Sequence, residues 1–394
     1  MGTEAGRSDR RNPMRIHPRR VRLEAATVCQ LKCPACATAS GKVGQALTSG
    51  FLRFEDFKRF VDENPRVSDI ELSNWGEIFL NPDLLDIITY ADEQHVLLRA
   101  DNGVNLNTVR EEVLEALVRH RFHSMTCSID GASQQTYALY RKRGSFDQVI
   151  EHIRRINEHK VRYRSAFPLL RWQFVAFGHN EHEAQAARRM ANALRMSFCV
   201  KLSWDETLSP VKDQELIRRE SGLGAASREE FREKYGEPYR GRTICAQLWR
   251  QPQINFDGRV LGCCVNYWGD FGNAFTDGLV ESVNNEKINY ARQMLLGHAA
   301  GRADIPCTTC RYYQSMKEDN AWVRQGDVKG AWGRSRLANR VRKKIHQILG
   351  PAGTQMWIRA HHVCSPRILR MRLRGRLRNP ARERRMPPIP GSTS

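Results

Sequence analysis

The chain has 394 residues, of which 41% are hydrophobic and 27% are charged. This length favours two or three domains with sizeable cores and excludes a peptide hormone or a small disulfide scaffold. No apolar run approaches the roughly 18 residues that a membrane span requires, and residues 1–20 contain no apolar signal core, so we expect a cytoplasmic protein.

The net charge of +20 is concentrated at the two ends of the chain. Residues 1–22 carry a net +5 and residues 329–387 a net +16, which leaves 39 basic and 40 acidic residues in 23–328. We therefore expect catalysis in the nearly neutral body. The alternative is an RNA- or surface-binding factor that contacts phosphates, an anionic membrane or an acidic partner through its tail, with Arg370, Arg372, Arg374, Arg376 and Arg378.

Residues 21–204 alternate short β-branched or apolar runs with helix-like stretches, which is typical of repeated βα units around a parallel sheet. The predicted strands are 21–26, 69–73, 96–100, 124–129, 169–177 and 198–203. The predicted helices are 54–64, 83–94, 107–119, 133–159 and 181–195. Six such units indicate an α/β fold with a partial (β/α)6 barrel similar to a TIM barrel, whose functional groups lie past the carboxyl ends of the strands.

The rest of the chain predicts a second, smaller domain and a basic tail. The expected segments are a basic N-terminal segment at 1–20, a core domain at 21–210, a helical linker at 211–240, a Cys-rich domain of short strands at 241–320, and an Arg-rich tail at 329–394.

Eleven cysteines in a chain without an export signal favour metal ligation over disulfides. Cys29, Cys33 and Cys36 form C-x3-C-x2-C directly after the first predicted strand, where three thiolates can converge on one iron–sulfur cluster. Three ligands would leave the fourth iron of a [4Fe–4S] cluster open for a chelating substrate or cofactor. A zinc site completed by His17 is the alternative.

Several further segments, in order, resemble the radical S-adenosylmethionine (SAM) superfamily over residues 20–205. Ser73-Asn74-Trp75-Gly76-Glu77 is similar to the family's GGEP segment, from which Trp75 and Ile78 depart. Asn102-Gly103, Ser128-Ile129-Asp130-Gly131 and Tyr140-Arg141-Lys142-Arg143-Gly144-Ser145-Phe146 resemble later motifs, and Asn180-Glu181-His182-Glu183 completes the series. The resemblance implies SAM binding, with Glu77 receiving the methionine amine, and a cofactor site formed by Glu77, Asn102, Ser128, Asp130 and Arg141. Taken singly, these segments also fit a turn, an N-cap or a solvated carboxylate.

Cys245, Cys263, Cys307 and Cys310 supply four thiolates that could close a second, auxiliary [4Fe–4S] cluster. Gly258 predicts a hairpin before Cys263, and Cys264 is the alternative ligand at this corner. A zinc ribbon would use the same residues. The pattern resembles the SPASM/twitch class of radical SAM enzymes, although the further cysteines of a full SPASM pattern are absent after Cys310.

A closed auxiliary cluster favours electron transfer from a substrate radical, and hence a net oxidation. The spacing of its cysteines resembles the 2-deoxy-scyllo-inosamine dehydrogenases, which implies oxidation of a hydroxylated sugar- or cyclitol-like molecule. Asp205 and Glu206 are the predicted catalytic bases, with Trp204 or Gln173 lining the pocket. The alternative is a maturase that modifies a ribosomally made peptide. Either reaction needs a low-potential electron donor such as flavodoxin or ferredoxin.

Overall fold

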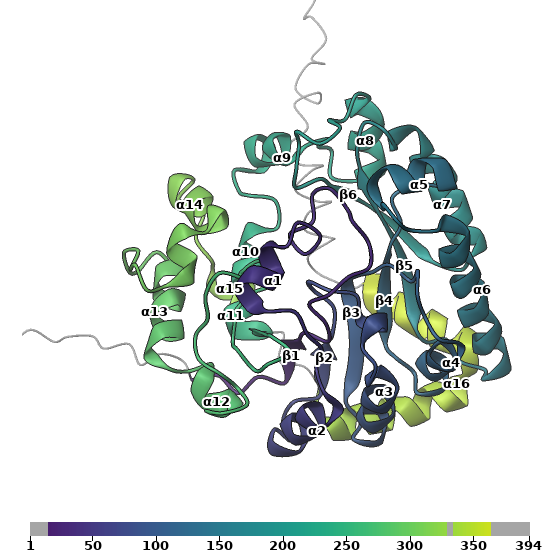
Figure 1. The fold of residues 1–394 in the computed structure, drawn as a ribbon, viewed down its shortest axis with the longest axis horizontal. Coiled ribbons are helices and arrows are strands. Elements are labelled where there is room, and N and C mark those ends of the chain that lie inside the picture. The colour runs from purple at the N-terminus through teal and green to yellow at the C-terminus, as the bar shows by residue number, and fades with distance from the viewer. Residues whose placement is uncertain (1–14, 329–333, 364–394) are drawn as a thin grey trace, which may run out of the picture.

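The computed structural model describes residues 15–328 and 334–363. Its centre is a seven-stranded sheet with the order β6-β5-β4-β3-β2-β1-β7, in which every neighbouring pair is parallel (Figure 1). The strands are β1 (Arg20–Leu23), β2 (Asp69–Glu71), β3 (Leu97–Val104), β4 (Ser124–Ser128), β5 (Leu169–Ala176), β6 (Ser197–Leu202) and β7 (Gln253–Ile254). Because β6 and β7 stand at opposite edges of this order, the sheet is open, which confirms the predicted partial barrel.

Helices cover the outer face of the sheet (Figure 1). They form the crossover connections that neighbouring parallel strands require. They are α2 (Phe54–Glu63), α3 (Leu84–Glu93), α4 (Glu111–Arg119), α5 (Gln134–Tyr140), α6 (Phe146–Arg162) and α7 (Ala184–Ala193). In α6, buried apolar residues recur at helical spacing from Phe146 to Ile156, and the Ser145 side chain caps the first turn.

A single helix was predicted over 133–159, but the structure has two helices there, α5 and α6. The prediction of one continuous helix was wrong. The break between α5 and α6 contains Arg143 with φ 68°. At the next residue, Gly144, a Cβ atom would stand 2.8 Å from the Tyr137 ring, so only glycine fits the turn.

Strand alternation divides the sheet into an apolar outer face and a polar inner face. Val21, Leu23, Ile70 and Leu72 belong to the buried core. Residues between them carry charge and meet one another across the strands, as where Arg99 Nε donates to Asp69 Oδ1 at 2.9 Å. The lumen of the barrel is therefore lined by polar groups.

Residues beyond β6 form helices and irregular segments that rejoin the barrel. The helices are α8 (Gln214–Ser221), α9 (Arg228–Tyr235), α10 (Gly241–Cys245), α11 (Gln247–Arg250), α12 (Leu279–Ser282), α13 (Glu286–Leu295), α14 (Arg311–Glu318) and α15 (Gln325–Val328). The short strands predicted for 241–320 were wrong except for β7 and the isolated bridges Ile254–Val260 and Arg259–Asn273. Local caps account for the difference, since the Asn285 side chain accepts from the Ile288 amide and starts α13.

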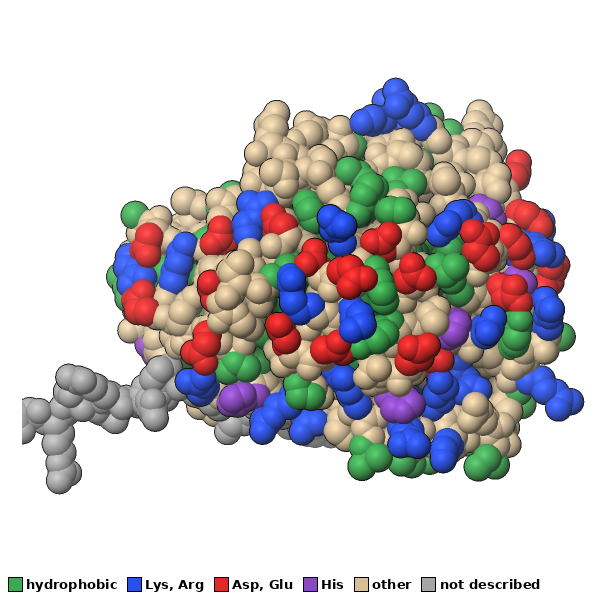
Figure 2. Space-filling view, turned by 60° about the horizontal axis from the view of Figure 1, so that its bottom comes forward, with side chains coloured by type: hydrophobic (Ala, Val, Ile, Leu, Met, Phe, Trp, Pro, Cys, Tyr) green, Lys and Arg blue, Asp and Glu red, His purple; other side chains and the backbone are tan. Residues whose placement is uncertain are grey.

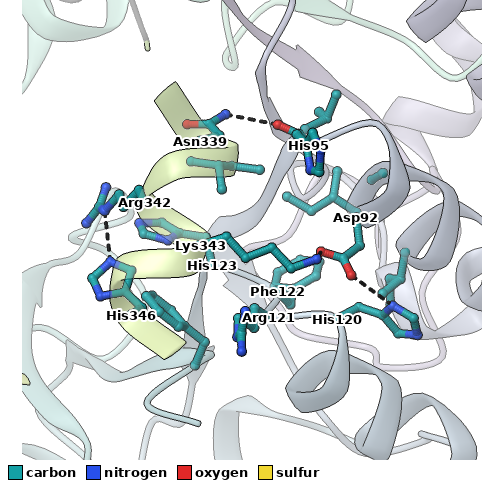
Figure 3. A pocket seen from close by; sticks show the side chains of 16 residues that line it. Asp92, His95, His120, Arg121, Phe122, His123, Asn339, Arg342, Lys343 and His346 are labelled. Carbon is teal, nitrogen blue, oxygen red and sulfur yellow. Dashed lines mark hydrogen bonds and ion pairs between the residues drawn. The ribbon is translucent and has the colours of Figure 1, made fainter. Parts of the chain in front are cut away.

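Part of the predicted tail is helical, as α16 (Arg336–Val363), which consists of two helices joined by a kink at Gly350. It packs beneath the amino ends of the strands (Figures 1 and 3). Asn339 Nδ2 donates to the carbonyls of Ser68 at 2.9 Å and His95 at 3.1 Å. Lys343 pairs with Asp92, which also contacts His120, so this helix closes the bottom of the barrel. The arginine run 370–378 lies outside the described residues.

The surface carries interspersed charges on the face seen in Figure 2, where Lys and Arg gather toward the lower edge. Among the described residues, none of the helices has the length and apolar character needed to cross a membrane.

Candidate iron–sulfur and cofactor-binding sites

The first cysteine group forms a loop, with α1 (Lys42–Leu47) following it, at the carboxyl end of β1. Cys33 is buried, and Cys29 and Cys36 are partly exposed. The Cys36 amide donates to the Cys33 carbonyl at 3.2 Å, which curls the loop. Burial, Glu77 and then the other two thiols raise the pKa of Cys29 to about 12, so the three sulfurs lie near one another.

The donor set fits a cysteine-ligated cluster better than zinc. Within the described ranges, no three His, Cys, Asp or Glu side chains are close enough to hold a single metal ion. A four-iron cluster is larger than one ion and separates its ligands further. His17 precedes β1 and stands at the opposite end of the strand from the cysteines, so it does not complete their site.

Two neighbouring side chains aim N–H donors at these sulfurs. Arg141 Nη1 lies 3.8 Å from Cys33 Sγ, and Asn105 Nδ2 lies 3.6 Å from Cys29 Sγ. Hydrogen bonds to sulfur are one of the means by which a protein tunes a bound cluster. The site therefore has both thiol ligands and polar partners for them.

Glu77 sits beside this loop in a buried position. Its Oε2 accepts from the Asn105 amide at 2.6 Å and its Oε1 accepts from the Phe79 amide at 3.4 Å. Burial raises the pKa of Glu77 to about 7 despite these hydrogen bonds. A Cβ atom on Gly76 would stand 2.2 Å from the Ala26 carbonyl, so glycine lets this loop press against the end of β1.

Asp130 and Arg141 form a buried ion pair. Asp130 has no exposed surface, and its Oδ2 accepts from Arg141 Nε and Nη2, each at 2.7 Å. Its Oδ1 accepts from the Val175 amide at 2.7 Å. Asp130 thus holds Arg141 in place beside Cys33.

Asn102 and Ser128 occupy the neighbouring ends of β3 and β4. Asn102 Nδ2 donates to Asn74 Oδ1 at 2.8 Å. Gly103 has φ 140°, and a Cβ atom there would stand 2.6 Å from Ser128 Oγ. The structure therefore brings the five predicted cofactor-binding residues to one edge of the sheet.

The second cysteine group lies within the main buried core. Cys245 ends α10, Cys263 follows the β7 hairpin, and Cys307 and Cys310 flank a short turn in which the Cys310 amide donates to the Cys307 carbonyl at 3.0 Å. Burial raises the pKa of Cys245 well above its ordinary value, and Cys263, Cys307, Cys310 and Cys264 add to this effect, so the thiols of this group and Cys264 lie near one another.

The backbone of Cys264 bonds to Gln247 and to the Asn74 side chain of the barrel. Its amide donates to Gln247 Oε1 at 2.7 Å, and its carbonyl accepts from Asn74 Nδ2 at 3.2 Å. Cys263 is the more buried of the two neighbours. The donor set of four thiols fits a closed iron–sulfur cluster and fits zinc by chemistry alone.

Asp205 and Glu206 lie apart from both cysteine groups. They line a cavity of about 460 Å³ on the outer side of β6, together with residues of α8 and α9. Asp205 Oδ1 accepts from the Thr207 and Leu208 amides, which lowers its pKa, and Glu206 Oε1 accepts from the Arg228 amide. The assignment of a catalytic base to this pair stays a prediction without geometric support.

Trp204, in contrast, reaches the first cysteine loop, where its Nε1 donates to the Ala35 carbonyl at 3.0 Å. Sequence reasoning missed Asn105 and Glu24. Glu24 Oε1 accepts from the Trp75 amide at 3.0 Å and holds the Glu77 loop. For Glu24, the signal available in the sequence was its place as the single acidic residue in the predicted strand from Val21 to Ala26.

Two family models match the chain. Residues 23–183 match the radical SAM superfamily, and residues 245–311 match the SPASM iron–sulfur cluster-binding domain. The first range contains Cys29, Cys33, Cys36 and Glu77, and the second contains all four cysteines of the second group.

Similar proteins extend these matches. Mycofactocin maturase MftC of Mycolicibacterium smegmatis is 26% identical over 136 residues, which span 34% of this chain and only 33% of MftC. The crystal structure of Streptococcus suis SuiB bound to S-adenosylmethionine has a TM-score of 0.54 at 13% identity, covering 75% of this chain and 71% of SuiB. SuiB bound to its precursor peptide SuiA has a TM-score of 0.52 at 13% identity, with 75% and 70% covered. At this identity the two SuiB structures show a shared fold.

Proposed function

Because the chain belongs to the radical SAM superfamily and carries a SPASM iron–sulfur domain, we propose that it cleaves SAM reductively and modifies a ribosomally made peptide. The observation that carries the proposal is the loop with the three thiols of Cys29, Cys33 and Cys36, set beside the buried Glu77 at the carboxyl edge of the sheet. When bound, a [4Fe–4S] cluster and SAM supply a 5′-deoxyadenosyl radical that removes a hydrogen atom from the substrate.

The residues at the sheet edge have separate roles in binding the cluster and SAM. Cys29, Cys33 and Cys36 ligate three irons. Glu77 receives the methionine amine, and Asn102 and Ser128 line the SAM site. Asp130 orients Arg141, whose guanidinium donates toward Cys33 and adds positive charge near the thiolates.

The four cysteines of the second group hold an auxiliary cluster with no open corner. Cys245, Cys263, Cys307 and Cys310 are all within the core or packed on it, so they exclude water from that group. A cluster held by four thiolates would have no free site for substrate, and it would supply an electron acceptor.

A peptide substrate is supported by the similar proteins. MftC is named a maturase, and SuiB was crystallised with a precursor peptide. Oxidation of a hydroxylated small molecule is the second candidate, and the spacing of the four auxiliary cysteines favours it. Both candidates need a low-potential donor such as flavodoxin or ferredoxin, and we propose a cytoplasmic location.

The test is iron and sulfide content after anaerobic reconstitution, followed by 5′-deoxyadenosine release under reductant. We expect about eight irons per chain for two four-iron clusters. Replacing Cys29, Cys33 and Cys36 by alanine should leave about four and abolish 5′-deoxyadenosine. Replacing Cys245, Cys263, Cys307 and Cys310 by alanine should also leave about four irons per chain.

Cys127→Ala is the matched control, because Cys127 is buried in β4 away from both groups and its loss should leave all the iron. Zinc in the second site, or 5′-deoxyadenosine from the first triple variant, would contradict the proposal.

A further inference from the structure

The inner face of β5 and β6 carries positive charge close to the first cysteine loop. Val175 packs against Cys33 and Tyr140, so its side of β5 faces the lumen. Lys201 is the direct cross-strand partner of Val175. Its neighbours Val200 and Leu202 pack outward against Ile217 of α8, so alternation places Lys201 in the lumen.

Lys201 also reaches toward both cysteine groups. Its Nζ lies 5.5 Å from the centre of the Trp204 ring, whose indole bonds Ala35 in the first cysteine loop. The Cys264 thiol, next to Cys263, acts electrostatically on Lys201. The ammonium therefore lies between the two candidate cluster sites.

Two arginines join Lys201. Burial and then the charges of Arg240 and Arg228 lower the pKa of Lys201 to about 8, which shows that the three cations are neighbours. Arg228 is fixed by Tyr312 at 3.0 Å, and its guanidinium carbon lies 5.2 Å from the Tyr239 ring centre. Arg228 Nε is buried and has no hydrogen-bond partner.

Among the described residues, the side chains of this group lack the acidic partners that nearby arginines have, and the Glu206 carboxylate contacts Arg228 only through the Arg228 backbone amide. Arg218 pairs with Glu230 at 2.6 Å, and Arg232 pairs with Asp319 at 2.7 Å. In contrast, within the described part of the chain Lys201, Arg228 and Arg240 form no ion pair. The carboxylate that acts on Lys201 is Asp130, which Arg141 already neutralises.

Lys201 and Arg228 are partly buried and Arg240 is exposed. Like charges gathered at such a partly desolvated place repel one another, and a bound anion would offset that cost. A carboxylate matches the planar fork of arginine and the ammonium of lysine. A peptide carries this group at its carboxyl terminus and on Asp and Glu side chains.

We propose that Lys201, Arg228 and Arg240 form a carboxylate-binding subsite that holds an acidic group of the substrate between the two cysteine groups. The proposal rests on the proposed function and deepens it, because it names the chemistry by which a peptide is placed in the lumen.

The test is the rate at which Lys201 of the anaerobically reconstituted full-length protein, with SAM, reacts with acetic anhydride, read by mass spectrometry. Three probes are compared: the blocked tripeptide acetyl-Gly-Gly-Tyr with a free carboxyl terminus, its carboxyl-terminal amide, and acetyl-Gly-Glu-Gly amide. We expect a free carboxylate to protect Lys201 and the fully neutral amide to leave it reactive. Protection by the first probe assigns the terminal carboxylate, and protection by the third assigns a side chain.

Arg240→Met should weaken this protection about tenfold, as expected for the loss of one charge-assisted hydrogen bond. Arg219→Met is the matched control, because Arg219 is exposed on α8, and protection should be unchanged. Equal labelling with all three probes, or no effect of Arg240→Met, would overturn the subsite.

5′-Deoxyadenosine release is measured on the same samples. If Lys201 is not protected although the protein cleaves SAM, the subsite is rejected and the proposed function is not. If Lys201 is protected although the protein releases no 5′-deoxyadenosine, the proposed function is rejected and the subsite is not.

Discussion

Arg141 shows how one residue serves both stability and the candidate site. It meets Asp130 through two nitrogens at 2.7 Å, and it points a third nitrogen at Cys33. Asp130 is fully buried, so its charge depends on Arg141 and on the Val175 amide. Removing the arginine would leave a buried carboxylate without its counter-ion.

We expect Arg141→Met to lower the free energy of unfolding by about 3–5 kcal/mol, because breaking a buried pair strands its partner. Asp130→Asn added to this variant should restore part of the loss. The measurement is urea unfolding of the cluster-free protein, followed by circular dichroism.

Arg155→Met is the control, because Arg155 pairs with Glu111 at the surface with 41% of its side chain exposed. Arg155→Met should lower the free energy of unfolding by less than about 1 kcal/mol. Equal costs for Arg141→Met and Arg155→Met would show that the buried pair contributes no more than a surface pair.

At the scale of elements, α16 is tied to the barrel by polar contacts to backbone carbonyls. Arg336 donates to the carbonyls of Val61, Asn64 and Val67, which lie at or after the end of α2. Asn339 bridges the carbonyls of Ser68 and His95, which precede β2 and β3. The Asn64 and Ser68 carbonyls also accept from the Val67 and Leu97 amides, so the side chains of α16 add to bonds already made within the barrel.

Asn339→Ala should destabilise the protein by about 1–3 kcal/mol, since it removes two hydrogen bonds that hold α16 against the barrel. It should also raise hydrogen exchange in residues 334–363 before the barrel strands are affected. The measurement is thermal unfolding together with hydrogen exchange read by mass spectrometry. Arg340→Ala, at an exposed neighbour in the same helix, should leave both unchanged, and equal effects of the two variants would show that the bridge does not dock α16.

At the scale of the whole molecule, the barrel and the SPASM domain share one core. β7 pairs in parallel with β1, and Arg22 Nε donates to Gln253 Oε1 at 2.8 Å. One continuous cluster of buried residues includes Leu23 and Ile70 of the barrel together with Ile254 and Met294 of the second region.

We expect the cluster-free protein to unfold in a single cooperative transition, because neither region keeps a complete core alone. Hydrogen exchange of peptides that contain Ile70 and Met294 should report the same opening free energy. Calorimetry that resolves two transitions, or a fragment ending at residue 240 that folds, would contradict this expectation.

The sequence predicted the strands, most helices and the grouping of the candidate site. Apolar runs of strand length separated by helical periodicity define the parallel barrel, and polar residues after those runs must meet at the carboxyl edge of the sheet. Cys29, Cys33, Cys36, Glu77 and Arg141 were found on this basis or by resemblance, and the structure brings them together.

Long-range contacts were not predictable in this way. Asn105 becomes a partner of Cys29 and Glu77 only when the end of β3 folds over the cysteine loop. Asp205 and Trp204 are adjacent, yet local hydrogen bonds turn Asp205 outward while Trp204 reaches the cysteines.

The sequence by itself therefore determined the fold class and the two cysteine groups, because periodicity and ligand spacing are local properties of the chain. Tertiary structure alone decided that β7 extends the barrel sheet, that α16 closes its bottom, and that Arg228 and Arg240 come close enough to Lys201 to act on its charge. Those outcomes depend on residues far apart in sequence, whose positions are set by packing and burial rather than by local pattern.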